Sequence, residues 1–282
     1  MPGNTTWANA AAFIRRHPTI IVGAALLLSI TLAALFAPWI ARDPIAFEPI
    51  NRLRAPSADF WLGTDSLGRD VYARMVYGAR ISLLVGLLVA VISIVCGSVI
   101  GLLAGYFTRV DAVVMRLMDG IMAIPSILLA IALVALLGAS VKVVIIAIAI
   151  PEIPRVTRLV RAVVLSVRDL PFVEAARSNG TRVGKLLRRH ILPSTVAPLI
   201  VQATYIAASA ILTEAGLSFL GAGTPPEFPT WGNMIASSRL YLQIAPWTIF
   251  APGICLALVV LAVNLVGDGL RDRLDPRISR RM

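Results

Sequence analysis

Few side chains in this sequence have a type and spacing that could do acid–base, nucleophilic or metal chemistry. The two histidines, His17 and His190, are far apart in the chain, which disfavours both a metal pair and a His-based catalytic group. The two cysteines, Cys96 and Cys255, lie inside apolar runs, so we expect packing residues rather than a disulfide framework or a Cys-rich metal site. We therefore predict that the chain is not an enzyme.

Phosphate-binding loops are also missing from the sequence. There is no G-x-x-x-x-G-K-[ST] pattern, so the chain cannot bind ATP by that route, and there is no G-x-G-x-x-G pattern. Gly180 to Lys185 comes near to the first pattern, but the spacing is wrong and Leu186 stands where a hydroxyl is needed. We expect the chain itself to hold no cofactor and no metal.

The composition instead indicates an all-α integral membrane protein. Of 282 residues, 58% are hydrophobic and 15% are charged, and the mean hydropathy is +0.83. Soluble domains carry about 45–50% apolar and about 25% charged residues. Because each bilayer crossing needs about 20 apolar residues, the chain has room for several spans and modest loops. It has no room for a sizeable soluble catalytic domain as well.

Six apolar runs predict six transmembrane helices. They are residues 19–40, 81–108, 113–138, 143–150 with its continuation, 191–213 and 244–266. The fourth run is interrupted by Pro151, Glu152 and Pro154. Because a carboxylate at mid-membrane costs about 2.5–3.5 kcal/mol, Glu152 should face protein or water rather than lipid. Either Arg155 or a partner subunit could supply its counter-ion.

The distribution of charge predicts the orientation of these helices. Between residues 155 and 189 the sequence has nine cationic residues but only Asp169 and Glu174, whereas the charges of residues 42–80 nearly cancel. Lys and Arg accumulate in cytoplasmic loops, so residues 155–189 and the basic segments Arg15–Arg16 and Arg271–Arg281 should be cytoplasmic. Both termini are then cytoplasmic. The net charge of +11 needs no nucleic acid, because no aromatic platform accompanies the arginines.

A polar segment before the second span, residues 63–70, combines turn-forming glycines with charged residues of both signs. Gly63 and Gly68 permit tight turns, while Asp65, Arg69 and Asp70 can form a local ion-pair cluster. One interpretation is a structural knot that seats an amphipathic helix, residues 71–79, on the outer membrane surface. The other is direct contact with a solute. We favour the structural knot.

The cytoplasmic loop, residues 168–193, predicts two short helices. Asp169 suits the N-cap of the first and Pro171 its first turn, while Asn179-Gly180 should end it. Thr181 can cap the second helix, and Pro193 can open the next membrane helix.

The first of these short helices carries residues that suit docking. Ala175 and Ala176 would permit close approach to a groove in another protein, and Glu174 offers one charged contact. An amphipathic element held by anionic lipid is equally compatible with the residues alone.

A longer pattern surrounds this loop. Residues 174–193 match E-A-A-x(3)-G-x(9)-[HI]-x-L-P at every fixed position, namely Glu174, Ala175, Ala176, Gly180, His190, Leu192 and Pro193. The loop thus resembles the EAA loop of binding-protein-dependent ABC importer permeases. The resemblance implies that these residues couple the chain to an ATPase, as a coupling helix seated in a cleft of the ATP-hydrolysing subunit.

Three further segments resemble one branch of that family, the dipeptide, oligopeptide and nickel permeases. The first is Gly63-Thr64-Asp65-Ser66-Leu67-Gly68-Arg69-Asp70; the others are residues 217–221 with 229–232, and residues 264–276. The first helix and polar loop resemble the C-type, or second, permease subunit. The resemblance implies a type I (MetI-like) permease with an extra N-terminal helix. We divide the chain into residues 1–80 and a five-helix core, residues 81–282, which holds the coupling loop.

The resemblance also implies a function and a set of partners. The chain would form half of a path for dipeptides or oligopeptides in the bacterial inner membrane; nickel chelates and glutathione remain open as solutes. Its partners would be membrane lipid, a homologous permease subunit in a heterodimer, two ABC ATPase subunits that bind the ATP, and an external solute-binding protein. The binding protein would dock on residues 224–242 and on residues 42–80. An ion- or proton-coupled secondary transporter is the alternative, since Glu152 interrupts a span.

Overall fold

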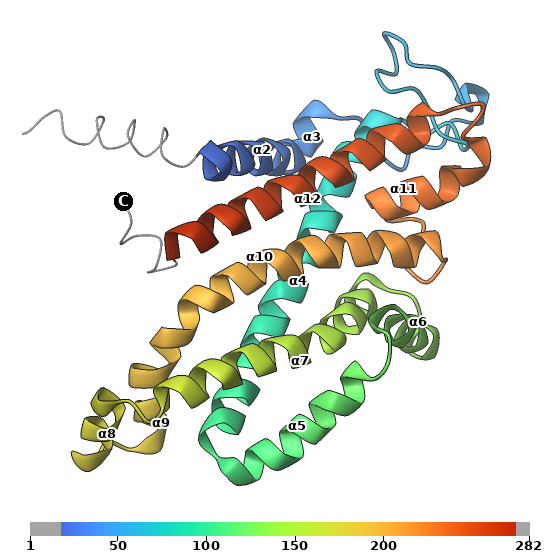
Figure 1. Cartoon of the computed structure of the whole chain (residues 1–282). Coiled ribbons are helices and arrows are strands. Elements are labelled where there is room, and N and C mark those ends of the chain that lie inside the picture. Colours follow the sequence, from blue (N-terminus) through green and yellow to red (C-terminus); the bar gives the residue numbers. More distant parts are fainter. Residues whose placement is uncertain (1–17, 275–282) are drawn as a thin grey trace, which may run out of the picture.

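The computed structural model describes residues 18–274, and its regular elements within this range are all helical (Figure 1). The basic flanks predicted at Arg15–Arg16 and beyond residue 274 lie outside the described residues. The elements are α2 (Pro18–Leu35), α3 (Ala37–Ile40), η1 (Pro49–Asn51), α4 (Val71–Tyr106), α5 (Thr108–Met122), α6 (Ser126–Leu137), α7 (Val141–Val167), α8 (Pro171–Ser178), α9 (Val183–Leu186), η2 (Leu187–Ile191), α10 (Leu192–Phe219), α11 (Trp231–Ser238), η3 (Arg239–Tyr241) and α12 (Trp247–Leu274).

Several helices are long and apolar enough to cross a membrane, which confirms the predicted class. Four meet the requirement alone: α2, α4, the continuous helix Val183–Phe219 and α12. The pair α5 and α6 can form one more span, bent by 87° between the two helices. Helix α7 has 27 residues, which is sufficient length, but it also carries five charged side chains from Lys142 to Arg161.

The second span begins earlier than predicted. Residues 71–79 are the first turns of α4 and not a separate helix on the membrane surface, so that prediction is wrong. Asp70 caps α4 by accepting a hydrogen bond from the backbone N–H of Tyr72 at 2.9 Å. The buried residues of these turns, among them Val71 and Val76, need protein around them rather than a lipid headgroup layer. The predicted division after residue 80 falls inside this helix and stays a prediction.

Proline acts differently in the third and fourth spans. The third span predicted at 113–138 is not one straight helix, because the chain turns between α5 and α6 at Pro125, which removes an N–H and disfavours helical geometry at the residue before it. The predicted interruption of the fourth span is wrong, since α7 continues through Pro151 and Pro154. Both prolines are buried, so neighbouring helices enclose the backbone that they leave unbonded.

The closest helix packing joins α4 to α7. Gly97, Gly101 and Gly105 recur every four residues along one face of α4 and meet Val156, Val160 and Val164 of α7. A Cβ added at Gly101 would lie 2.7 Å from the backbone oxygen of Thr157 and 2.8 Å from Val160 Cβ. Spacing of small residues by four allows two membrane helices to approach at backbone distance. This glycine stripe therefore fixes the register of α7 on α4.

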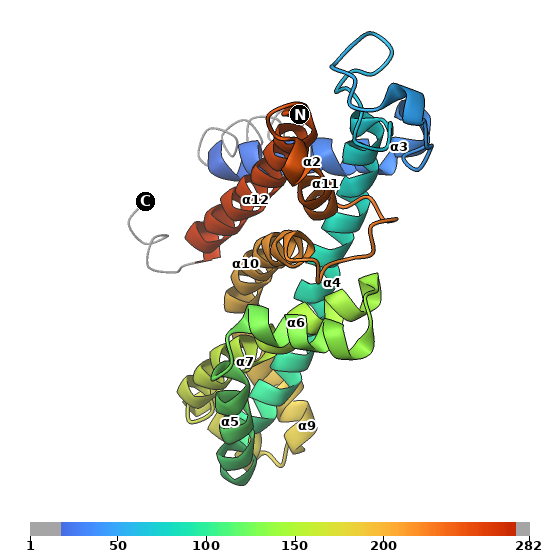
Figure 2. The same ribbon diagram turned by 90° about the vertical axis from the view of Figure 1, so that its right-hand side faces the viewer.

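Two apolar clusters each include buried residues of α4. The first gathers buried residues of α4, α6, α7 and α10 with those of the cytoplasmic loop. The second is formed by α2, α4, α10, α11 and α12. Helix α2 packs against α12 and α4, and Figure 2 shows α2 and α12 at the end opposite to α5 and α9. Helices α4 and α10 contribute to both clusters and so connect them.

We expect Gly101→Ala to destabilise the protein by about 1–3 kcal/mol, because the added methyl group overpacks the contact between α4 and α7. Gly253→Ala in α12 is the matched control, since a Cβ there meets no atom within 4 Å. Thermal unfolding in detergent, followed by tryptophan fluorescence, measures both. Equal midpoints for the two variants would contradict the stripe.

Candidate functional site

The cytoplasmic loop carries the first candidate site. Helix α8 begins with Pro171 in its first turn, as predicted, but its N-cap is Leu170. The predicted cap is wrong because Asp169 turns its carboxylate to Arg168, at 3.4 Å. The end of α8 is as predicted: Gly180 has φ of +74°, and the N–H of Thr181 bonds back to the carbonyl of Ala176 at 3.1 Å. Glycine adopts that backbone conformation without strain.

The two faces of α8 have different roles. Val173 and Ala176 are buried in the first apolar cluster, whereas Phe172, Glu174 and Ala175 are exposed. The two alanines therefore lie on different faces, and only Ala175 is available to a partner. The exposed face combines one aromatic ring, one small residue and one carboxylate at the tip of the molecule, where α8 lies in Figure 1. Such a face can enter a groove of another protein.

Behind α8, the chain passes into α10 without a break. The predicted second helix is only the four residues of α9, capped at Arg182 and not at Thr181. The π-helical segment η2 follows, in which the N–H of Leu192 bonds to the carbonyl of Leu187. This wider turn carries the helix past Pro193, which sits in the first turn of α10 as predicted. His190 is half-buried beside it. Helix α10 is thus joined rigidly to the cytoplasmic loop.

A basic face lies on the outer side of this connection. Arg182, Lys185, Arg188 and Arg189 are exposed and, with Gly184, line a hollow of about 700 Å³. None of the four side chains forms an ion pair with any residue of the range 18–274. Their spacing places them along one side of the helix, so this face suits an anionic surface.

The external segment is the second candidate site. Gly63 and Gly68 have φ of +71° and +76°, as their turns require. The carboxylate of Asp65 accepts the backbone N–H groups of Leu67 and Arg69, at 2.8 and 3.0 Å, and forms an ion pair with the Arg69 side chain at 2.7 Å. Thr64 accepts the N–H of Arg54 at 2.8 Å. Every one of these contacts is internal, which supports the structural knot.

Asp70 does not join the predicted ion-pair cluster, and Arg74 joins it instead. Asp70 caps α4, and burial raises the pKa of its carboxyl while hydrogen bonds from the backbone of Tyr72 oppose that shift. Arg74, only 2% exposed, takes its place beside Asp65 at 3.7 Å. The indole N–H of Trp247 donates to the carbonyl of Thr64 at 3.3 Å, so the knot also holds the start of α12.

A buried polar network that was not predicted surrounds Glu214. Glu214, near the external end of α10 and 1% exposed, accepts hydrogen bonds from three hydroxyls, those of Ser218 at 2.8 Å, Thr230 at 3.0 Å and Thr224 at 3.2 Å. Asn233 of α11 donates to the side chain of Thr224 at 2.9 Å. These bonds tie the loop after α10 and the start of α11 to α10. The only sequence signal was a carboxylate directly after an apolar run that was predicted to end at residue 213.

Three arginine side chains of α7 form ion pairs. Glu152 pairs with Arg155 at 3.1 Å, which confirms one of the two counter-ions considered for it. Arg158 pairs with Asp119 of α5 at 2.5 Å, and Arg161 pairs with Asp111 of α5.

At the cytoplasmic end of α7, Arg168 donates to the carbonyl of Gly105 at 3.0 Å. Helices α4, α5 and α7 are therefore joined where the coupling loop begins.

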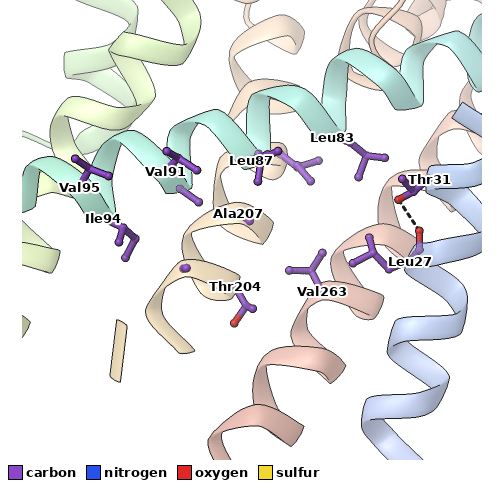
Figure 3. A pocket seen from close by; sticks show the side chains of 14 residues that line it. Leu27, Thr31, Leu83, Leu87, Val91, Ile94, Val95, Thr204, Ala207 and Val263 are labelled. Atoms are coloured by element: carbon purple, nitrogen blue, oxygen red, sulfur yellow. Dashed lines mark hydrogen bonds between the residues drawn. The ribbon is translucent and has the colours of Figure 1, made fainter. Parts of the chain in front are cut away.

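An apolar hollow of about 510 Å³ opens between α2, α4, α10 and α12 (Figure 3). Its only side chains with hydroxyl groups are Thr31 and Thr204. Both hydroxyls are already bonded within their own helices, to the carbonyls of Leu27 at 2.7 Å and Val201 at 2.8 Å. The hollow offers no free donor to a polar solute and suits hydrocarbon.

Comparison with known proteins gives two family matches. Residues 97–280 match the model described as the binding-protein-dependent transport system inner membrane component. Residues 5–56 match the N-terminal TM domain of oligopeptide transport permease C.

Individual relatives cover nearly the whole chain. A probable peptide ABC transporter permease protein, y4tQ, of Sinorhizobium fredii is 61% identical over 95% of this chain and 92% of its own length. The dipeptide transport system permease protein DppC of Alkalihalophilus pseudofirmus is 46% identical over 97% and 90%. The glutathione transport system permease protein GsiD of Pectobacterium atrosepticum is 41% identical over 95% and 89%.

Among solved structures, an inward-facing MetNI methionine ABC transporter has a similar fold. The TM-score is 0.57 at 17% identity, over 72% of this chain and 96% of that chain.

We expect Asp65→Ala to open the external segment, because it leaves the buried Arg74 without its carboxylate, a loss of about 3 kcal/mol or more. The matched control is Asp59→Ala, since Asp59 is exposed in the same segment. Limited trypsin digestion should cut the first variant faster at Arg52, Arg54 and Arg69. Cleavage at the same rate in both variants would contradict the structural knot.

Proposed function

The chain belongs to the inner membrane components of binding-protein-dependent transport systems, and we propose that it carries dipeptides or oligopeptides. It is a permease subunit of an ABC importer and a multi-pass protein of the inner membrane, with the MetI-like fold that the sequence predicts. Subunits of this family work with ATPases and with a solute-binding protein.

The names of the relatives support a peptide as the solute. Two of those most similar over the full length are named as peptide or dipeptide permeases, and the N-terminal match is to an oligopeptide permease domain. Glutathione stands second, through the relative from Pectobacterium. Nickel chelates have no comparable support among these relatives.

The assembly we propose contains one second permease subunit, homologous to this chain, and two ATPase subunits. Exposed apolar side chains on α5 and α6, such as Val113, Leu117 and Leu136, offer a surface for the second permease. Because the sequence has no phosphate-binding loop, ATP would be bound and hydrolysed only by the partner ATPases. Both termini would then lie on the cytoplasmic side, together with the basic face beside α9. The external solute-binding protein would dock on residues 42–80 and 224–242.

The observation that carries the coupling proposal is that α8 has one buried side and one exposed side. Its Val173 and Ala176 side is packed into the core, and its Phe172, Glu174 and Ala175 side is exposed. A partner ATPase that moves α8 would also move α10, through η2, and α4 with α7, through the bond between Arg168 and Gly105. ATP binding and hydrolysis would thereby switch the path between inward-open and outward-open states.

The secondary-transporter alternative loses its basis in the structure. It rested on a carboxylate in a broken span, but α7 is continuous and Glu152 is paired with Arg155. Membership of the ABC importer family gives the energy source instead.

We expect Gly180→Val to uncouple ATP hydrolysis from uptake while the complex still inserts, because a β-branched residue opposes the φ of +74° that ends α8. Gly180→Asn is the matched control: it adds a side chain of similar size at the same site, but asparagine tolerates that φ. A Cβ at residue 180 meets no atom within 4 Å, so space does not separate the two variants.

Peptide uptake and ATPase activity in proteoliposomes measure the effect. Uptake should fall by about tenfold or more in the valine variant and stay near the normal rate in the asparagine variant. Normal uptake by Gly180→Val would contradict the coupling role of α8, whatever solute the transporter carries.

A further inference from the structure

The pair of Glu152 and Arg155 lies near the middle of the membrane. Helices α4 and α7 run parallel, and two contacts fix their register: Ser93 donates to the carbonyl of Ala149 at 3.4 Å, and Gly97 faces Val156. Glu152 is therefore level with α4 between Ser93 and Gly97. Since α4 has no charged residue from 81 to 108, this level is the centre of its uncharged run.

The two charged side chains are placed differently. Glu152 is 6% exposed, and both of its oxygens bond to a single nitrogen of Arg155, Nη1, at 3.1 and 3.4 Å. The Arg155 side chain is 43% exposed. Its other nitrogens, Nε and Nη2, have no acceptor among the residues that the structure describes. One nitrogen of the guanidinium is thus held by Glu152, while the side chain as a whole remains partly exposed.

A guanidinium so placed needs a polar neighbour. Arginine within a membrane span faces a water-filled path or a protein partner, because hydrocarbon cannot satisfy its donors. Arg158, one turn further along the same side, already has its partner in Asp119 of α5. Arg155 has only the contact on Nη1, so this side of α7 at the level of Arg155 should face the path.

We propose that Arg155 binds the C-terminal carboxylate of the passing peptide and that Glu152 is its positioning residue. This inference rests on the proposed peptide function. A guanidinium presents its N–H groups as a planar fork that fits a carboxylate with two parallel hydrogen bonds, and Nε and Nη2 form the fork that Glu152 leaves open. A peptide with a free C-terminus brings that carboxylate into the membrane.

Glu152 also limits how tightly Arg155 can hold the solute. Its carboxylate keeps Arg155 partly neutralised and fixed by one nitrogen, so the peptide meets an oriented but weakened cation. A transport path needs contacts that are strong enough to admit a solute and weak enough to release it.

The test compares each peptide with its own C-terminal amide. The complete transporter, with its partner permease, ATPases and binding protein, is reconstituted in proteoliposomes, and initial uptake is measured at saturating peptide. Only dipeptides whose acid and amide both bind the binding protein are used. We expect the wild type to take up the acid about tenfold faster than the amide. In Arg155→Gln the ratio should fall to about one, while ATP hydrolysis stimulated by the loaded binding protein continues.

Two further variants complete the test. Arg155→Lys keeps the charge without the planar fork and should retain an intermediate ratio. Arg158→Gln is the matched control, because its side chain is 44% exposed on the same helix but paired with Asp119, and its ratio should equal that of the wild type.

An unchanged ratio in Arg155→Gln, or an equal loss in Arg158→Gln, would overturn the assignment of Arg155. A wild-type complex that hydrolyses ATP but takes up neither form of any peptide would instead overturn the peptide function. If Arg155→Gln fails to assemble, the wild type alone still tests the proposal. Equal uptake of the acid and the amide by the wild type would refute a contact between Arg155 and the C-terminal carboxylate of the peptide.

Discussion

Three glycines on α4 allow α7 to approach until its valines lie against the α4 backbone, and the rest of the molecule depends on this contact. A membrane offers helices no hydrophobic gain from association, so close packing and directed polar bonds must supply it. The contact fixes the register of α7 against α4. That register determines the depth in the membrane at which each side chain of α7 lies. Glu152 and Arg155 reach mid-membrane, while Arg161 and Arg168 reach the cytoplasmic ends of α5 and α4. The coupling loop begins from that anchored end.

Helix α10 returns from the loop and is held at both ends. On the cytoplasmic side, η2 continues the helix from α9 into α10, and α8 packs against this helix through Val173 and Ala176. On the external side, Glu214 accepts hydrogen bonds from three hydroxyls and so fixes the loop that leads to α11. The indole of Trp231, in α11, donates to the carbonyl of Met75 on α4 at 3.0 Å. A force applied at α8 therefore acts on one connected body that extends to the external surface. This continuity is what a transporter needs when its fuel is hydrolysed by another subunit.

The sequence predicted some of these features because their causes are local. Composition sufficed for the membrane class, and the turn at Gly180 follows from the preference of a single residue type. The start of α4 and the bend at Pro125 were misjudged, since hydropathy reports transfer into lipid and not helical continuity. The helix breaks before Pro125, whereas α7 continues through Pro151 and Pro154, which are enclosed by other helices. Glu214 accepts hydrogen bonds from hydroxyls that are up to 16 residues away in the sequence. Asp169 forms an ion pair with Arg168 and does not cap α8. Such choices are made by tertiary contacts.

The central claim is that this chain is one membrane half of an ATP-driven importer. Purification of the tagged chain from its native host in mild detergent, followed by mass spectrometry of what accompanies it, tests that claim most directly. We expect stoichiometric recovery of a second, homologous permease and of two ATPase subunits. Recovery of this chain alone, as a stable homo-oligomer, would contradict it.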